Sequence, residues 1–233
     1  MPVSEAFSVG EYLPLAHREI DAALAGGRRP IVVGGTGLYL RAALTELDLR
    51  PPPAPGVRER IEAEVTARGP AALHAELSRR APGAAARIDP ADRSRIVRAH
   101  ELLEAGEDPV AVAPEARESQ LWTAGTRRPT LLIGLVAERG ALYAAIGERV
   151  QGIVAAGAAE EVRLAAAAGA SPTARAALGF EELLAGDVEA LERRTRNLAK
   201  RQLTWMRKLA GAKRIDVTGR DPAEVAEESV VCL

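Results

Sequence analysis

The sequence has few cysteines, few lysines and few aromatic residues, and these shortages exclude several classes of protein. Cys232 is the single cysteine in 233 residues, which excludes an internal disulfide framework and a cysteine-based zinc site. No apolar run approaches the roughly 18 residues that a membrane helix needs. The N-terminal residues lack the basic and apolar regions of a secretory signal. With 47 alanines and only two Phe, three Tyr and two Trp, the sequence predicts a soluble, cytoplasmic protein with an aliphatic core.

Positive charge is concentrated in one segment, although the whole chain has a net charge of −1. Residues 193–208 contain seven Lys and Arg side chains and no acid. On a helix these cations fall within an arc of roughly 160°, and apolar residues such as Leu198 and Trp205 occupy the remaining arc. A basic face suits a polyanion, because phosphate contacts release counterions. The alternative interpretation is a solvated helix that leans on acidic neighbours.

Helical patterns alternate with short apolar runs, which predicts an α/β fold with a parallel sheet. Ser8 and Glu11 form a predicted capping box for a helix that ends near Ala25. Asp89 is the expected N-cap of a later helix, with Pro90 at its first position. Further helices are expected at residues 38–44, 139–168 with a break near Gly157, 173–184, 193–208 and 222–228.

Three short strands are expected, at residues 30–33, 130–136 and 214–218. A parallel sheet of three strands is small for a chain of this length. The proline-rich break at residues 50–56 precedes a stretch that reads as purely helical. We therefore expect an α/β core formed by residues 1–50 and 126–233, interrupted by a helical insert at residues 51–125. Residues 107–129, which lead from the insert back into the core, are expected to be rich in loops.

The segment Gly34–Gly37 is expected to turn the chain between a strand and a helix. Its glycines would let backbone N–H groups point at an anion, and Thr36 adds a hydroxyl. A plain strand–turn–helix connection is the alternative. The sequence contains no G-x-x-x-x-G-K-[ST] motif. His17, His74 and His100 lie far apart without metal-ligand spacing, which is typical of ordinary helix-face residues.

Four segments carry more specific motifs. They are residues 31–39 (IVVGGTGLY), residues 89–98 (DPADRSRIVR), residues 149–180, which run from Arg-Val through Gly157 to Leu-Gly-Phe, and residues 195–205 (TRNLAKRQLTW). In this order they resemble the tRNA dimethylallyltransferase (tRNA isopentenyltransferase) family. The last motif is highly specific, and the resemblance covers essentially the whole chain.

The resemblance implies a reaction and a fold. The family transfers a dimethylallyl group from dimethylallyl diphosphate to the exocyclic amine (N6) of the adenosine 3′ of the tRNA anticodon. The target base is flipped into a channel, the general solution when chemistry must reach a base. The implied fold is a P-loop NTPase-like parallel sheet core with a helical insert that grips the anticodon stem-loop. The diphosphate would lie on the P-loop with Mg²⁺.

The resemblance also assigns candidate residues. Thr36 would line the channel, and Arg149 would neutralise the diphosphate leaving group, so these two are the catalytic candidates. Gly34 and Gly35 join Arg149 as diphosphate-binding candidates, and no residue is assigned to a metal. The tRNA-binding candidates are Ser94, Arg95, Arg98, Ala176, Gly179, Phe180, Glu181, Arg196, Lys200, Arg201, Gln202, Thr204, Trp205 and Arg207. The basic arc of residues 193–208 contains the candidates from Arg196 to Arg207, so two independent arguments select one helix.

The sequence departs from the family pattern in two ways. Family members begin with a P-loop and a strand bearing a catalytic Asp, and these 233 residues contain neither, so we expect a core that is incomplete at its N-terminus. Without positioning, charge stabilisation and a base, this chain alone is expected to transfer little or no prenyl group. The alternative is a non-catalytic RNA-binding remnant.

The second departure is Glu181, which stands where the family usually has Lys or Arg. We expect a monomer that binds tRNA and dimethylallyl diphosphate and no membrane.

Overall fold

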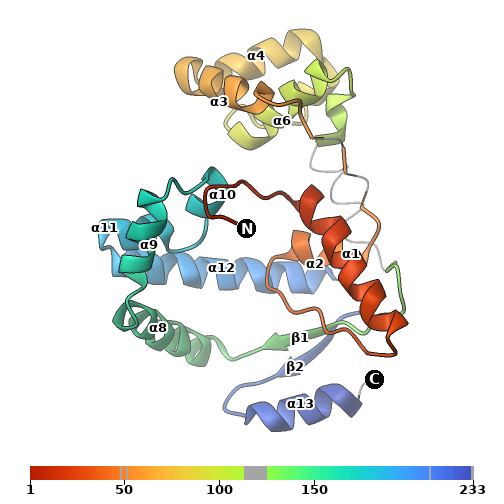
Figure 1. Ribbon diagram of the computed structural model, residues 1–233, viewed down its shortest axis with the longest axis vertical. Coiled ribbons are helices and arrows are strands. Elements are labelled where there is room, and N and C mark those ends of the chain that lie inside the picture. Colours follow the sequence, from red (N-terminus) through yellow and green to blue (C-terminus); the bar gives the residue numbers. More distant parts are fainter. Residues whose placement is uncertain (48, 51, 113–124, 210, 232–233) are drawn as a thin grey trace. The chain divides into compact units, whose positions relative to one another are not determined.

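The chain divides into two compact units, which we describe separately (Figure 1). A computed structural model describes residues 1–47, 49–50, 52–112, 125–209 and 211–231. Residues 1–46 and 124–233 form the first unit, and residues 47–123 form the second. Cys232 and most of the loop expected at residues 107–129 lie outside the described residues.

The first unit is mostly helical, with one small parallel sheet (Figure 1). Its elements are α1 (Val9–Ala25), α2 (Gly37–Leu44), β1 (Ile133–Val136), α8 (Arg139–Ala155), α9 (Ala158–Ala167), α10 (Pro172–Arg175), α11 (Phe180–Ala185), α12 (Val188–Lys208), β2 (Lys213–Asp216) and α13 (Pro222–Val231). In the described part of the chain, no helix is long and apolar enough to cross a bilayer.

The sheet consists of β1 and β2, which pair in parallel with Gly134 opposite Arg214. The strand expected at residues 30–33 is wrong, because these residues pair with no described strand. An apolar run becomes a strand only when a neighbour accepts its backbone hydrogen bonds. Ile31 and Val33 are instead 86% and 90% exposed.

The local helix signals at the start of the chain are confirmed. The Ser8 backbone N–H donates to the Glu11 carboxylate at 2.7 Å, and the Glu11 N–H donates to Ser8 Oγ at 3.3 Å. α1 is joined to α2 by the tilted rings of Tyr12 and Tyr39, whose centroids are 4.9 Å apart. The break near Gly157 is also confirmed, since this residue has a left-handed φ of 92° between α8 and α9.

The helix expected at residues 173–184 is wrong as a single element. It is divided into α10 and α11, because Gly179 adopts a φ of 99° between them. A Cβ at this position would lie 3.1 Å from a methyl carbon of Leu191 in α12. The break therefore lets the turn approach α12 closely.

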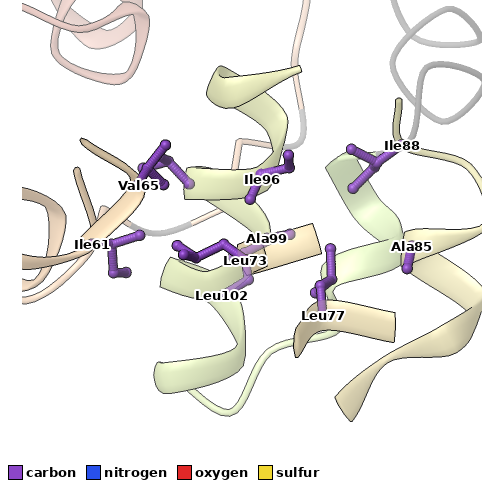
Figure 2. Packing of buried hydrophobic residues seen from close by; sticks show 10 residues of the cluster. Ile61, Val65, Leu73, Leu77, Ala85, Ile88, Ile96, Ala99 and Leu102 are labelled. Carbon is purple, nitrogen blue, oxygen red and sulfur yellow. The ribbon is translucent and has the colours of Figure 1, made fainter. Parts of the chain in front are cut away.

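The second unit packs its helices around a core of its own. Its elements are α3 (Val57–Arg68), α4 (Pro70–Arg80), α5 (Pro82–Ala85), α6 (Arg93–Glu104) and a 3₁₀ turn, η1 (Pro109–Val112). Figure 2 shows the apolar side chains of α3, α4 and α6 meeting in this core. Leu77 and Ile96 are both fully buried in it. The sequence places such residues three or four positions apart, so each helix has one buried face.

The start of α6 differs from the sequence prediction. The N-cap is Asp92, whose carboxylate accepts the Arg95 N–H at 3.0 Å and also pairs with the Arg95 guanidinium. Asp89 lies upstream, where its carboxylate accepts the Ala91 N–H at 2.8 Å. The prediction of Asp89 as the cap is therefore wrong. The segment contains two aspartates three residues apart, and the first closes a turn that delays the helix.

This difference gives a testable prediction. Asp92→Ala should lower the free energy of unfolding by about 1 kcal/mol, because the first turn of α6 loses its cap. Asp89→Ala should lower the free energy of unfolding by a smaller amount. Urea denaturation of both variants measures the difference, and a larger loss for Asp89→Ala would contradict the assignment.

Candidate functional site

α12 is the helix that carries the candidate functional charges. Its N-cap is Asp187, whose carboxylate accepts the Ala190 N–H at 2.8 Å. Glu189 lies in the first turn, and Arg207 and Lys208 lie in the last. This order of charges matches the helix dipole, so it stabilises the helix as well as shaping its surface.

The arginines in the N-terminal half of α12 are all paired with carboxylates. Arg193 lies 3.7 Å from Glu189, and Arg196 pairs with Glu192 one turn away. Arg194 pairs with Glu182 of α11, whose side chain is only 8% exposed. Glu182 lies on a neighbouring element, as the acidic-neighbour interpretation predicts, whereas Glu189 and Glu192 belong to α12 itself.

The C-terminal half of α12 differs. Lys200, Arg201 and Arg207 are exposed, and no described carboxylate pairs with any of them. Thr204 is exposed on the same half and donates its hydroxyl to the Lys200 carbonyl at 3.0 Å. These three cations are consequently available to an external anion, whereas Arg196 is not.

The opposite face of α12 packs against glycines. A Cβ on Gly37 would lie 1.5 Å from the Trp205 ring, and one on Gly35 would lie 2.0 Å from the Gln202 amide nitrogen. Gly37 is therefore required for the approach of α12, a role that sequence reasoning did not assign, whereas at Gly35 the flexible Gln202 side chain could move away from a Cβ. Thr36 is the N-cap residue of α2 and makes no side-chain capping bond.

A first cavity, of about 320 Å³, lies beside the glycine segment. Gly34, Gly35 and Thr36 line it together with Tyr12 and Tyr39. The structure thus brings three of the predicted site residues to one hollow. Arg149 lies elsewhere, exposed on α8, and lines neither this cavity nor the next.

A second cavity, of about 670 Å³, lies between α8, α12 and the sheet. We call it the basic cavity, because Arg139, Lys200, Arg207 and Arg214 line it. Its remaining lining is largely apolar and includes Leu203. Sequence reasoning missed Arg139 and Arg214, since neither belongs to the basic segment.

The predicted tRNA-binding residues near α11 are only partly accessible. Gly179 and Phe180 are buried, whereas Ala176 and Glu181 are exposed. Glu181 lies 3.0 Å from Arg175, whose guanidinium also lies over the Phe180 ring. Ala176 and Glu181 can therefore contact a partner directly, whereas the buried Gly179 and Phe180 shape the turn.

In the second unit, the predicted tRNA-binding residues also differ in how accessible they are to a partner. Ser94 is exposed, whereas Arg95 pairs with Asp92. Arg98 donates to Glu101 at 2.8 Å and to the Arg50 carbonyl at 3.0 Å, so its guanidinium is held within the unit. Glu101 is fully buried, and its carboxylate needs the two cations that pair with it, Arg58 and Arg98.

The pairing of Glu182 with Arg194 predicts a pH effect. Burial raises the pKa of the Glu182 carboxyl, but the Arg194 guanidinium and the Gly179 N–H outweigh it and hold this pKa below its ordinary value. The pair therefore stabilises the fold above the unfolded-state pKa of about 4.3, and this stabilisation is lost as the pH falls through the folded-state pKa. Unfolding midpoints measured from pH 7 to pH 3 should fall less steeply for Glu182→Gln than for wild type.

The motifs and the fold together allow a comparison with known proteins. A family model described as IPP transferase matches residues 1–209. The tRNA dimethylallyltransferase of Rhodospirillum centenum is 42% identical, and the match covers 99% of this chain and 75% of that protein. The chain belongs to the IPP transferase family. The tRNA dimethylallyltransferase of Symbiobacterium thermophilum is 39% identical over 98% of the chain and 74% of its own length.

Solved structures of IPP transferase relatives share this fold. The crystal structure of the full-length tRNA isopentenylpyrophosphate transferase from Bacillus halodurans matches with a TM-score of 0.62 and 31% identity, over 97% of this chain and 73% of that one. A eukaryotic dimethylallyltransferase acting on tRNA matches with a TM-score of 0.71 at 21% identity, which shows the fold alone.

The Mg²⁺ expected for an IPP transferase can be tested against the donor groups. Among the residues that the structure describes, no three His, Cys, Asp or Glu side chains are grouped so as to hold a metal ion. Hard cations such as Mg²⁺ need clustered oxygen ligands. The described residues do not fit a metal site, so no step is assigned to Mg²⁺ and its binding stays a prediction.

Proposed function

We propose that this chain acts in tRNA dimethylallyl transfer, moving a dimethylallyl group from its diphosphate to N6 of the adenosine 3′ of the anticodon. The observation that supports this proposal is that Lys200, Arg201 and Arg207 of α12 have no carboxylate partner among the described residues. They lie within and just beyond the motif that resembles the family most specifically. The three cations fit the phosphates of an RNA stem-loop. We further propose that the first unit is a P-loop NTPase-like core, because its parallel strands alternate with helices.

The chemistry requires charge stabilisation at one point above all. The amine nitrogen attacks the dimethylallyl carbon, the carbon–oxygen bond to the diphosphate breaks, and the diphosphate leaves with the electron pair while the amine loses a proton. Negative charge therefore grows on the leaving group in the transition state, where fixed cations lower the barrier. Arg149 is the predicted cation for this role, and its exposure on α8 leaves it accessible to the diphosphate.

The proposal is tested by measuring binding and transfer separately. The 233-residue chain is titrated into a labelled anticodon stem-loop with adenosine 3′ of the anticodon, and into a hairpin of equal length and unrelated sequence. Tighter binding to the anticodon stem-loop is expected, and equal binding would contradict the proposal. Radiolabelled dimethylallyl diphosphate then measures transfer. Because this chain alone is expected to transfer little or no prenyl group, binding without transfer is the expected result, and substantial transfer would contradict that expectation.

A further inference from the structure

The basic cavity concentrates four cations around an apolar hollow. Arg139, Lys200, Arg207 and Arg214 line it, and no described carboxylate either lines the cavity or pairs with any of the four. All four side chains are exposed, and like charges that converge on one space repel each other even where solvent weakens the repulsion. An anion bound among them would remove this repulsion.

The four cations come from three elements that the fold brings together. Lys200 and Arg207 are seven residues apart on α12, so they lie on the same helix face two turns apart. Arg214 on β2 is paired in register with Gly134, against which Met206 of α12 packs. Arg139 is the first residue of α8, just after the carboxyl end of β1. Ligands of open parallel sheets bind at this end of the strands.

Arg139 lies beside an aromatic side chain. Its guanidinium lies 5.8 Å from the centre of the Tyr143 ring, and Arg196 lies 5.1 Å from the same ring. Both distances fall within the range of a cation–π contact. Tyr143 itself lines the cavity, beside Leu142 and Leu203. The site thus combines oriented cations with an apolar wall.

We propose that the basic cavity binds a phosphate or diphosphate group, with Arg139 and Arg214 as ligands beside Lys200 and Arg207. The inference rests on the proposed function, which supplies two sources of this chemistry. One is the diphosphate of the prenyl donor, whose short tail is apolar like the wall around Leu203, and this source would place the diphosphate away from Arg149. The other is a backbone phosphate of the RNA. Guanidinium groups suit both, because their donors match phosphate oxygens in pairs.

The test uses inorganic diphosphate as the first probe, titrated calorimetrically into the 233-residue chain. Arg139→Gln and Arg214→Gln should each weaken binding about tenfold, since each removes a charged hydrogen-bond donor. Arg139→Lys and Arg214→Lys keep the charge and should recover part of the affinity. Arg18→Gln is the matched control, because Arg18 is exposed and lies 3.4 Å from Glu19, outside the basic cavity.

Two further titrations distinguish the sources. Tighter binding of dimethylallyl diphosphate than of inorganic diphosphate, without competition from the anticodon stem-loop, assigns the cavity to the prenyl donor. Competition by the stem-loop, with a smaller salt slope in the Gln variants, assigns it to an RNA phosphate. The proposal is overturned if the wild-type chain binds neither diphosphate, or if the Gln variants bind like Arg18→Gln. Equal affinity for the stem-loop and the unrelated hairpin would refute the proposed function alone, because the diphosphate titration does not depend on RNA.

Discussion

Replacing Lys200, Arg201 and Arg207 together by Gln is expected to weaken binding of the anticodon stem-loop by about 100-fold near 0.1 M salt. Each of these side chains is exposed without a described carboxylate partner, so each can neutralise one RNA phosphate. The slope of log affinity against log salt should become smaller by about one unit per residue removed. Fluorescence anisotropy at several salt concentrations measures both quantities.

A charge-matched control separates specific contacts from net charge. Arg18, Arg163 and Arg193 are exposed arginines of the first unit, and each pairs with a neighbouring carboxylate. Replacing all three by Gln changes the net charge equally and costs little stability, because exposed pairs contribute at most about 1 kcal/mol each. The control triple should retain most of the affinity. If both triples lose equal affinity, binding depends on overall charge, and the difference between the paired arginines and Lys200, Arg201 and Arg207 has no functional meaning.

The sequence predicts well those features that depend on a few neighbouring residues. The capping box of Ser8 and Glu11, the break at Gly157 and the continuous helix over residues 193–208 all arise from local hydrogen bonding and periodicity. The strand expected at residues 30–33 failed because it depends on a partner elsewhere in the chain. Hydrophobicity alone indicates that a run of residues can be buried. Val33 belongs to such a run and is nevertheless exposed.

The candidate site shows the same division. The basic arc was visible from spacing, but its separation into two halves was not. Arg194 is neutralised by Glu182, which lies on another helix and is brought close by packing. Arg139 and Arg214 are 75 residues apart in the sequence, and only the parallel pairing of β1 and β2 brings their elements together. Charges that meet through tertiary structure carry no signal in a single sequence.

Gly37→Ala is expected to lower the free energy of unfolding of the first unit by about 3 kcal/mol, at the upper end of the range for overpacking. The new Cβ would lie 1.5 Å from a ring carbon of Trp205, and the backbone of α2 cannot move without also shifting α1, which packs on it. The Trp205 ring must then leave its position, and α12 moves with it. Because α12 carries Lys200, Arg201 and Arg207, affinity for the anticodon stem-loop should fall as well.

Gly34 provides the control for this substitution. A Cβ on Gly34 meets no atom within 4 Å, so Gly34→Ala should change stability by less than about 0.5 kcal/mol. Urea denaturation of Gly37→Ala, Trp205→Ala and the double variant completes the test as a double-mutant cycle. The double variant should lose less than the sum of the two single losses, because the clash disappears with the ring. Additive losses would show that Gly37 and Trp205 do not interact, and that the glycine segment has another role than admitting α12.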